Sequence, residues 1–337
     1  MEKKDGKYRK TLFCSQFQTI SDGEQVFDMF LLISVKYNSN TRGVKWLELK
    51  LQDNSGTISA RVWADNIRSE YDSMEGQPVF VKGCVNFYAG RPEITVEMLR
   101  VVKDGEFELS ELCRMVSEDI VNGDIHDMER LISSIKDESV RDFTAHILTK
   151  DRMLEMASLP VHLYGHHNYR GGLLEHTFEV AFGSYYHAKV TGAARRYPLD
   201  LDMIISGALL HDIAVISRIA HCGYGYRERA FSGIAGNFPL YEILAEARWQ
   251  TGLPDMVFAH ISHIIEAAHD DRVPKTAEAM MVRSANLLSI ENNRLEDTLW
   301  SRRATCGDKV WSRVLERDVY RFGKEEDAAA RGNKEKN

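Results

Sequence analysis

The sequence lacks any long hydrophobic run, since no apolar stretch approaches the ~20 residues that a membrane-spanning helix requires. Its first residues, Met-Glu-Lys-Lys-Asp-Gly-Lys, also lack the apolar core of a secretory signal. The five cysteines are scattered along the chain and form no Cys-x-x-Cys pair. These absences predict a cytoplasmic protein with reduced thiols, without membrane association and without a cysteine-based zinc site.

Three common catalytic signatures are absent as well. The chain contains no Gly-x-x-x-x-Gly-Lys-Ser/Thr phosphate loop, no Gly-x-Ser-x-Gly elbow and no His-Glu-x-x-His helix. Any catalytic site must therefore be built from another combination of residues.

Positive charge is scarce overall, but it is unevenly distributed. The 337 residues carry a net charge of −7. Residues 1–105 hold 15 Lys or Arg and 14 Asp or Glu, which leaves 28 and 36 for the rest of the chain. A polyanion should therefore meet the N-terminal part first. With 44% hydrophobic residues, the chain is long enough for two domains with separate cores.

Between residues 26 and 102 the sequence alternates apolar and polar residues with period two, and turn signals interrupt the alternation at short intervals. A polar, helix-compatible segment, Asp65–Glu75, follows the third strand. We expect the five strands at about Val26–Lys36, Lys45–Gln52, Thr57–Ala64, Pro78–Phe87 and Pro92–Val102. This order predicts a five-stranded OB-like β-barrel in residues 1–105, a fold that often binds oligonucleotides.

The alternation also predicts which side chains face outward. On the third strand Arg61 and Trp63 point away from the core, and cations beside aromatic rings suit single-stranded nucleic acid, because phosphates are neutralised while bases stack. The predicted nucleic-acid-binding residues are Lys50, Arg61, Trp63, Lys82, Tyr88 and Arg91. The alternative is a solvated barrel face with Trp63 covered by a loop.

After residue 105 the periodicity becomes helical. We expect a linker at 106–125, an all-α domain at 126–323 and a disordered, charged tail at 324–337. The fold class is thus a two-domain α+β protein, with a long loop at Cys222–Pro239. The helices are expected at Met128–Ile135, Val140–Thr149, Asp151–Ala157, Leu173–Lys189, Leu201–Ile219, Leu240–Thr251, Asp255–Ala268, Thr276–Asn292 and Trp311–Tyr320.

Ten of the twelve histidines fall within residues 162–269. The dipeptide His-Asp occurs three times, so it is a weak signal by itself. The copy His211-Asp212 is set apart because it ends an apolar helix and an upstream helix carries His176. A single histidine is more often an ordinary surface or core-edge residue, but for these three together we predict a metal site or the remains of one.

Two motifs, Gly171–Thr177 (Gly-Gly-Leu-Leu-Glu-His-Thr) and Gly207–Ile213 (Gly-Ala-Leu-Leu-His-Asp-Ile), follow the barrel. In this arrangement the chain, from about Gly23 to Asn293, resembles the YhaM family of 3′-to-5′ exoribonucleases. These enzymes join an OB-fold to an HD-superfamily phosphohydrolase domain. They hydrolyse RNA, and often single-stranded DNA, with a divalent metal such as manganese. The resemblance implies single-stranded RNA or DNA as the partner, and leaves a homo-oligomer open.

The resemblance extends to the metal ligands only in part. It implies a metal-binding set of His176, His211, Asp212, His269 and Asn286, with His211 and Asp212 as the catalytic pair. Asn286 replaces an aspartate of the family, and Ile234 and Ala268 stand at two further ligand positions. His260 or His263 could substitute for a lost ligand. We therefore expect one divalent ion, manganese by resemblance, or an empty site, rather than a two-metal centre.

Three functions remain open at this stage. The first is a metal-dependent exoribonuclease or phosphodiesterase with weakened activity. The second is a catalytically silent nucleic-acid-binding or scaffold protein, and the third is a phosphohydrolase of small nucleotides. An OB-fold favours the first two, whereas the incomplete ligand set favours the second over the first. The nuclease is kept as the principal hypothesis.

Overall fold

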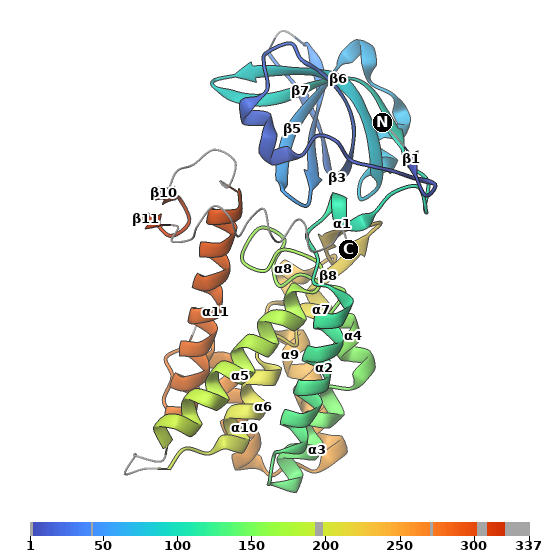
Figure 1. Ribbon diagram of the computed structural model, residues 1–337. Helices are drawn as coiled ribbons and strands as arrows, with labels where there is room; N and C mark the ends of the chain where they lie inside the picture. The colour runs from blue at the N-terminus through green and yellow to red at the C-terminus, as the bar shows by residue number, and fades with distance from the viewer. Residues whose placement is uncertain (1–2, 42, 193–197, 270–271, 302–308, 321–337) are drawn as a thin grey trace.

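The computed structural model describes residues 3–41, 43–192, 198–269, 272–301 and 309–320. Figure 1 shows an N-terminal β-barrel standing above a bundle of helices. The predicted α+β class, with strands first and helices after them, is confirmed. The predicted tail at 324–337 lies outside the described residues. None of the described helices is long and apolar enough to cross a membrane.

Five strands close the barrel in the order β3–β4–β5–β7–β6. They are β3 (Gln25–Ser39), β4 (Lys45–Asp53), β5 (Gly56–Trp63), β6 (Pro78–Tyr88) and β7 (Arg91–Val101). β5 and β7 pair in parallel, whereas the other neighbours are antiparallel. This order, with the short 3₁₀ segments Ala64–Asn66 and Ser69–Met74 between the third and fourth strands, is consistent with an OB-fold. The predicted strands are confirmed, with ends within three residues.

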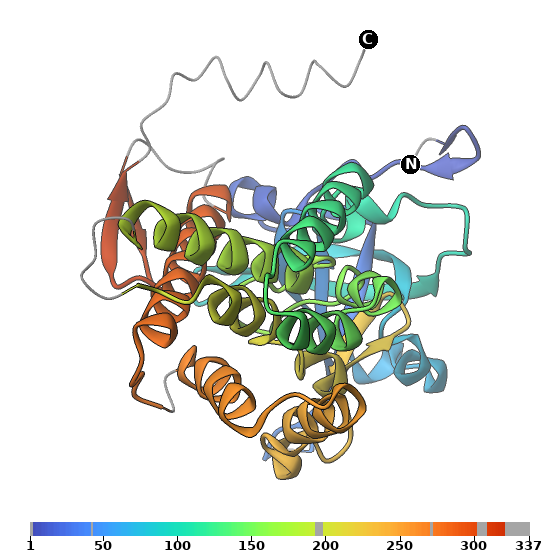
Figure 2. The same cartoon turned by 90° about the horizontal axis from the view of Figure 1, so that it is seen from below.

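The helical part is built around α6, whose residues from Met203 onward are all buried. Seen from below, α6 is surrounded by α3, α5, α10 and α11 (Figure 2). The Asp200 carboxylate caps α6, as its position before an apolar run predicts. The helices are α1 (Leu109–Leu112), α2 (Glu118–Ser133), α3 (Glu138–Ile147), α4 (Lys150–Met156), α5 (Gly172–Gly192), α6 (Leu201–Leu210), α7 (Val215–Arg218), α8 (Ser232–Ala235), α9 (Phe238–Thr251), α10 (Asp255–Ala267) and α11 (Ala277–Ser301).

Three predictions for this part need correction. Leu201–Ile219 is not one helix, because α6 ends at Leu210 and a buried turn precedes α7; the turn is as apolar as the helices, so periodicity did not mark it. Trp311–Tyr320 belongs to a hairpin, β10 (Lys309–Ser312) and β11 (Arg317–Tyr320), in which Val310 faces Val319. The expected linker at 106–125 contains α1 and the first turns of α2.

A second hairpin, β8 (Ile219–Cys222) and β9 (Gly225–Glu228), joins the two parts. It occupies the start of the segment expected to be a loop, and its Tyr224 N–H donates to the Gly76 carbonyl at 2.7 Å. Gly76 has a φ of +80°, and a Cβ added there would lie 1.9 Å from the Cys222 carbonyl oxygen. A Cβ on Gly223 would lie 2.5 Å from the Gly76 oxygen. The contact therefore requires two glycines, and we call it the glycine clasp.

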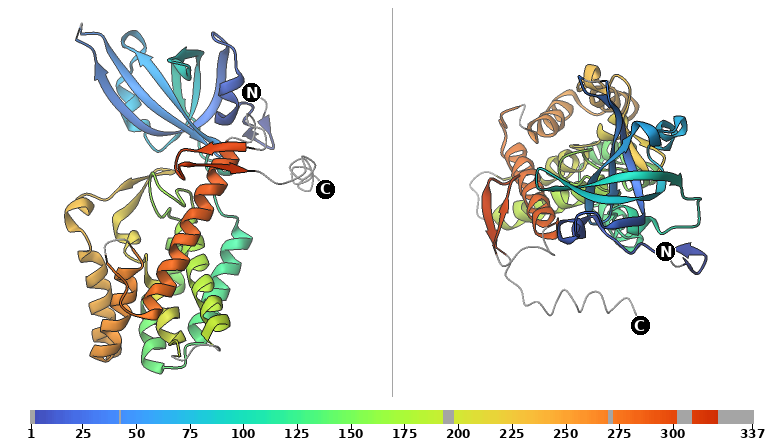
Figure 3. Two further views of the ribbon diagram at one scale, coloured as in Figure 1. Left: turned by 90° about the vertical axis from the view of Figure 1, so that its left-hand side faces the viewer. Right: turned by 90° about the horizontal axis from the view of Figure 1, so that it is seen from above.

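The segment after the barrel is also fixed to α11, which runs the length of the helical part towards the barrel (Figure 3). Arg114 donates to Asp297 at 2.5 Å and to Glu296 at 2.9 Å, and its guanidinium lies 3.9 Å from the centre of the Tyr169 ring.

A third hairpin, β1 (Lys3–Lys4) and β2 (Lys7–Tyr8), begins the described chain.

Candidate metal centre

Three predicted ligands come together in the core of the helical part. His176 lies in the first turns of α5, and His211 and Asp212 directly follow α6. The two Nε2 atoms are 3.1 Å apart, and each lies 3.5 Å from Oδ2 of Asp212. Ligand atoms about 2.1 Å from one ion lie about 3.0 to 3.4 Å from each other, depending on geometry. These three residues, the HD triad, therefore have the spacing of ligands that share one ion.

Hydrogen bonds at the far side of each ring fix the proton positions in the HD triad. Nδ1 of His211 donates to the Ala208 carbonyl at 2.8 Å. Nδ1 of His176 lies 2.8 Å from Oγ of Ser289, whose hydroxyl donates to Glu179. Both Nδ1 atoms thus carry the proton, and both Nε2 atoms carry a lone pair. Two lone pairs face each other at 3.1 Å, an arrangement that a bound cation would stabilise.

Asn286, the predicted fourth ligand, lies one turn from Ser289 on α11. Its amide group donates to the Ala268 carbonyl at 2.9 Å. Its Oδ1 is buried and has no hydrogen-bond partner among the described residues. Since buried acceptors are normally paired, this free oxygen fits a ligand to a hard cation. The donors present thus fit a divalent ion, with a neutral oxygen at this position.

His269, the remaining predicted ligand, lies beside the HD triad. Its Nε2 donates to the His211 carbonyl at 3.2 Å and is 3.5 Å from Oδ1 of Asp212. Its side chain keeps 39% of its surface exposed. With Nε2 protonated and engaged, His269 borders the centre rather than completing it.

The charge states in the HD triad suit metal binding. Burial lowers the pKa of His176 well below its ordinary value, and burial likewise lowers that of His211. Burial raises the pKa of Asp212, but the neighbouring imidazoles outweigh it and hold that pKa well below its usual range. Neutral imidazoles and an ionised carboxylate are the forms that bind a metal ion.

These pKa shifts predict that the metal-free protein loses stability in mild acid. His176, His211 and His166 all have a folded-state pKa below 6.5, and that of His166 falls to about 3, chiefly through burial. Below pH 6.5 the unfolded chain therefore binds more protons. Stability should fall as the pH drops below 6.5, by up to about 1.4 kcal/mol per pH unit for each imidazole. Urea denaturation of chelator-treated protein at several pH values measures how the free energy of unfolding changes with pH. Replacing His166 with asparagine should make stability fall less steeply as the pH drops.

His211 and Asp212 of the HD triad line a cavity of about 370 Å³. Arg218 lines this cavity together with His211, Asp212 and His269, and its buried Nε has no hydrogen-bond partner among the described residues. Ser232 and Gly233 of α8 also line it, whereas Ile234 is 85% exposed. Ile234 therefore does not fill the space where the resemblance implies a ligand.

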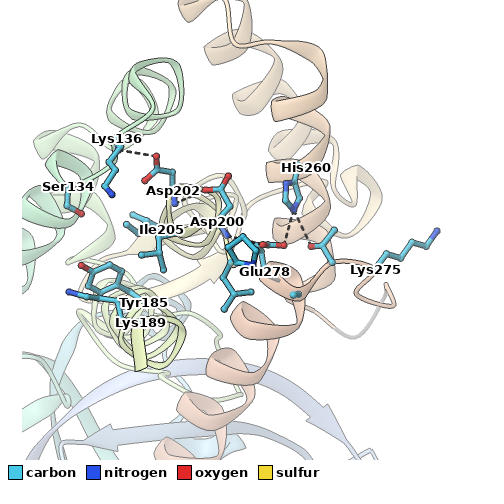
Figure 4. A pocket seen from close by; sticks show the side chains of 15 residues that line it. Ser134, Lys136, Tyr185, Lys189, Asp200, Asp202, Ile205, His260, Lys275 and Glu278 are labelled. Carbon is cyan, nitrogen blue, oxygen red and sulfur yellow. Dashed lines mark hydrogen bonds and ion pairs between the residues drawn. The ribbon is translucent and has the colours of Figure 1, made fainter. Parts of the chain in front are cut away.

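A larger hollow, of about 1200 Å³, lies elsewhere in the helical part (Figure 4). Glu278, which lines it, accepts from the backbone N–H of Asp200 at 3.1 Å and lies 3.5 Å from Nε2 of His260. His263 accepts from the Lys275 N–H. His260 and His263 thus have partners of their own, and neither belongs to the groups of close metal donors among the described residues. Their substitution for a lost ligand is not supported.

On the barrel, Arg61 lies within an aromatic cluster. Its guanidinium is 5.5, 5.1 and 6.0 Å from the ring centres of Trp46, Trp63 and Tyr88. Trp63 and Tyr88 are 39% and 72% exposed, so Trp63 is not buried beneath a loop. Arg61 is also paired with Glu93 at 3.0 Å. The face therefore offers rings more freely than positive charge, and we call it the barrel aromatic face.

The other predicted binding residues are divided among several places. Arg91 pairs with Tyr88 at the β6–β7 turn and so borders the barrel aromatic face. Lys82, on β6, is paired with Glu97 at 3.2 Å. Nζ of Lys50 lies 5.8 Å from the ring of Tyr164, in the segment between α4 and α5. Lys50 therefore faces the helical part.

Several residues of these sites were not predicted. Trp46 faces Trp63 across β4 and β5, a pairing that the strand register would have shown. Glu179, three residues after His176 on the same helix, could have been found from helical spacing. The resemblance places Ser289 at an acidic position of the family, without indicating its contact with His176. Arg218 could not be found from the sequence, because only tertiary packing brings it to the cavity beside His211 and Asp212.

No known protein-family model matches the chain. It is similar to the second OB-fold domain of replication protein A from Methanococcus maripaludis, with 18% identity over 26% of this chain and 93% of that one, and a TM-score of 0.22. It is also similar to asparaginyl-tRNA synthetase from Pyrococcus horikoshii, with 20% identity over 42% of this chain and 35% of the synthetase, and a TM-score of 0.23. A third likeness is to RecG bound to a three-way DNA junction, with 18% identity over 50% of this chain and 24% of RecG, and a TM-score of 0.22. The chain thus spans about a third of the synthetase and a quarter of RecG. At such TM-scores these likenesses do not define the fold, which rests on the strand order.

Proposed function

We propose that this protein is a metal-dependent phosphodiesterase that degrades single-stranded nucleic acid. By the resemblance to the YhaM family, the proposed enzyme is a YhaM-like 3′-to-5′ exoribonuclease that has an HD-superfamily domain and weakened activity. The observation that carries the proposal is the HD triad, in which two imidazole lone pairs and one carboxylate converge. A divalent ion bound there would lower the pKa of its water and withdraw charge from a phosphodiester.

The chain's own residues have separate parts in this proposal. His176, His211, Asp212 and the Asn286 oxygen hold the ion. Arg218, with its unpartnered Nε in the same cavity, binds the phosphate, because guanidinium groups match phosphate oxygens. The barrel aromatic face holds the strand by stacking with its bases.

Arg218→Lys tests the phosphate contact. Lysine keeps the charge but loses the planar donor pair, so KM for an oligonucleotide should rise about 10-fold while metal affinity stays unchanged. Steady-state kinetics and calorimetric metal titration measure the two quantities. Arg229→Lys serves as control, because Arg229 is an exposed arginine that does not line the cavity. An unchanged KM in the Arg218 variant would assign the phosphate to other donors.

Two other functions have some support. The HD triad contains a single carboxylate, which favours a catalytically silent protein that binds nucleic acid through the rings of the barrel aromatic face. The cavity of about 370 Å³ would suit a mononucleotide, which favours a small-nucleotide phosphohydrolase.

End-labelled single-stranded RNA and DNA separate the three functions. We expect stepwise shortening of the strand with added Mn²⁺, none with a chelator, and none with His211→Gln. Binding without shortening under any metal would favour the silent protein. Hydrolysis of free nucleotides alone would favour the third function.

Binding at the barrel aromatic face can be tested separately. Arg61→Ala combined with Trp63→Ala should weaken binding of a single-stranded oligonucleotide about 10- to 100-fold, because each stacked base contributes about 1–3 kcal/mol. Fluorescence anisotropy at several salt concentrations measures the affinity. Lys103→Ala, which removes an exposed lysine that is not among the predicted binding residues, is the control and should change affinity little. Equal affinities for the double variant and the wild type would refute the assigned face.

A further inference from the structure

A second cluster of imidazoles touches the HD triad. His166 and His167 lie in the segment before α5, and their rings stand 4.9 and 4.8 Å from that of His176. Their Nδ1 atoms are 3.1 Å apart. This is the spacing found between the Nε2 atoms of the HD triad, and it again matches two ligands of one ion. Both side chains are buried, His167 almost completely.

The backbone holds His167 in an unfavourable conformation. His167 has a φ of +48°, in the left-handed region that non-glycine residues seldom adopt. Its N–H donates to Oδ1 of Asn293 at 2.8 Å, and its carbonyl accepts from Val161 at 3.0 Å. A Cβ on Gly172 would lie 2.4 Å from that carbonyl oxygen. The motif Gly171-Gly172 thus lets the chain pass closely enough to hold His167, and strain of this kind is concentrated at functional sites.

One carboxylate supports both clusters. Oε2 of Glu179 lies 3.5 Å from Nε2 of His167 and also accepts from Ser289, which in turn contacts His176. A proton on Nε2 of His167 faces this carboxylate and leaves a lone pair on Nδ1, directed at His166. Carboxylates behind an imidazole in this way are characteristic of metal-ligand histidines.

We propose that His166 and His167 bind a second divalent transition-metal ion through their Nδ1 atoms, next to the ion of the HD triad. One nitrogen from each of His166, His167 and His176 lies within 4.8 Å of the others, so the second cluster shares His176 with the HD triad. A site of imidazoles without a carboxylate donor selects zinc, cobalt, nickel or iron over magnesium and calcium. The inference rests on the proposed function, since it makes the phosphodiesterase centre binuclear. The competing explanation is an ordinary hydrogen bond between the two Nδ1 atoms.

Metal stoichiometry of the full chain tests the proposal. Purified protein is titrated with Co²⁺, whose visible absorption reports imidazole ligation, and bound metal is counted after desalting. We expect two ions per chain in the wild type and one in His166→Asn or His167→Asn, because asparagine keeps a hydrogen bond but is a poor ligand. His162→Asn is the matched control: its ring contacts His166 at 4.8 Å but belongs to neither cluster, so two ions should remain.

The outcomes distinguish this inference from the function on which it rests. One ion in the wild type that is lost in Asp212→Asn but kept in both asparagine variants overturns the second site and leaves the phosphodiesterase. One ion lost in His166→Asn but kept in Asp212→Asn supports the second site and counts against the first. No bound ion in the wild type overturns both. If His166→Asn does not fold, the number of ions bound by His167→Asn and the Co²⁺ end point of the wild type decide whether the second site exists.

Discussion

Asp212→Asn is expected to weaken divalent metal binding at the HD triad by about 100-fold or more. In the part of the chain that the structure describes, Asp212 is the carboxylate that lies 3.5 Å from both Nε2 atoms. The substitution therefore removes the negative charge that attracts a cation while keeping the shape of the side chain. Calorimetric titration with Mn²⁺ measures the loss. Hydrolysis of single-stranded RNA should disappear with it.

The control for this prediction is Asp127→Asn. Asp127 also follows a histidine, but it lies on α2, where its carboxylate accepts from Arg130 at 3.2 Å. Its replacement should leave metal affinity unchanged. The metal-free Asp212→Asn protein should melt below the wild-type temperature, because a folded-state pKa held below its usual range means that the ionised carboxylate stabilises the fold. Wild-type affinity for Mn²⁺ in this variant would show that the HD triad is not a metal site.

Gly76→Ala is expected to detach the β8–β9 hairpin from the barrel. The new Cβ would lie 1.9 Å from the Cys222 carbonyl oxygen, so the glycine clasp has to open. Small-angle scattering should show a larger radius of gyration, and proteolysis should cut within residues 219–228. Metal stoichiometry should not change, whereas degradation of long strands should slow because the two parts no longer hold one strand together.

Gly90→Ala is the matched control for Gly76→Ala. Gly90 has a φ of +76°, close to the +80° of Gly76, but a Cβ there would meet no atom within 4 Å. Both variants carry the backbone cost of a left-handed alanine, about 1–2 kcal/mol. Only Gly76→Ala adds the clash. Equal scattering profiles for the two variants would mean that the clasp does not hold the parts together.

The barrel could be predicted closely from the sequence because period-two alternation is a local signal. Ile58, Ala60 and Val62 are buried on β5 while Ser59 and Trp63 point outward, and this pattern depends only on neighbouring residues. The hairpin at 309–320 was mistaken for a helix because apolar residues that pair across a short hairpin can also fall at helical spacing. Register, rather than periodicity, distinguishes the two.

The candidate site could be predicted only where a motif carried it. His176, His211 and Asp212 were found from their setting in apolar helices, and Asn286 only from the resemblance. The sequence did not predict His166 and His167 as site residues, because they lie in an irregular segment without periodicity. The position of His167 also depends on a hydrogen bond to Asn293 of a distant helix. Whether two lone pairs face each other is likewise decided by hydrogen bonds to Ala208 and Ser289.

The glycine clasp also bears on how this protein can evolve. Its contacts are made by backbone atoms. The Tyr224 N–H donates to the Gly76 carbonyl, and the backbone at Gly76 packs closely against the backbone at Gly223. Tyr224 adds side-chain contacts, because its hydroxyl donates to Asp104 at 2.8 Å and its ring packs against Phe107. The other side chains of the hairpin can drift without altering these backbone contacts, whereas neither glycine can change alone. Among diverged descendants of this chain, the joint retention of both glycines should mark those that keep the same arrangement, even where the surrounding sequence is no longer alike.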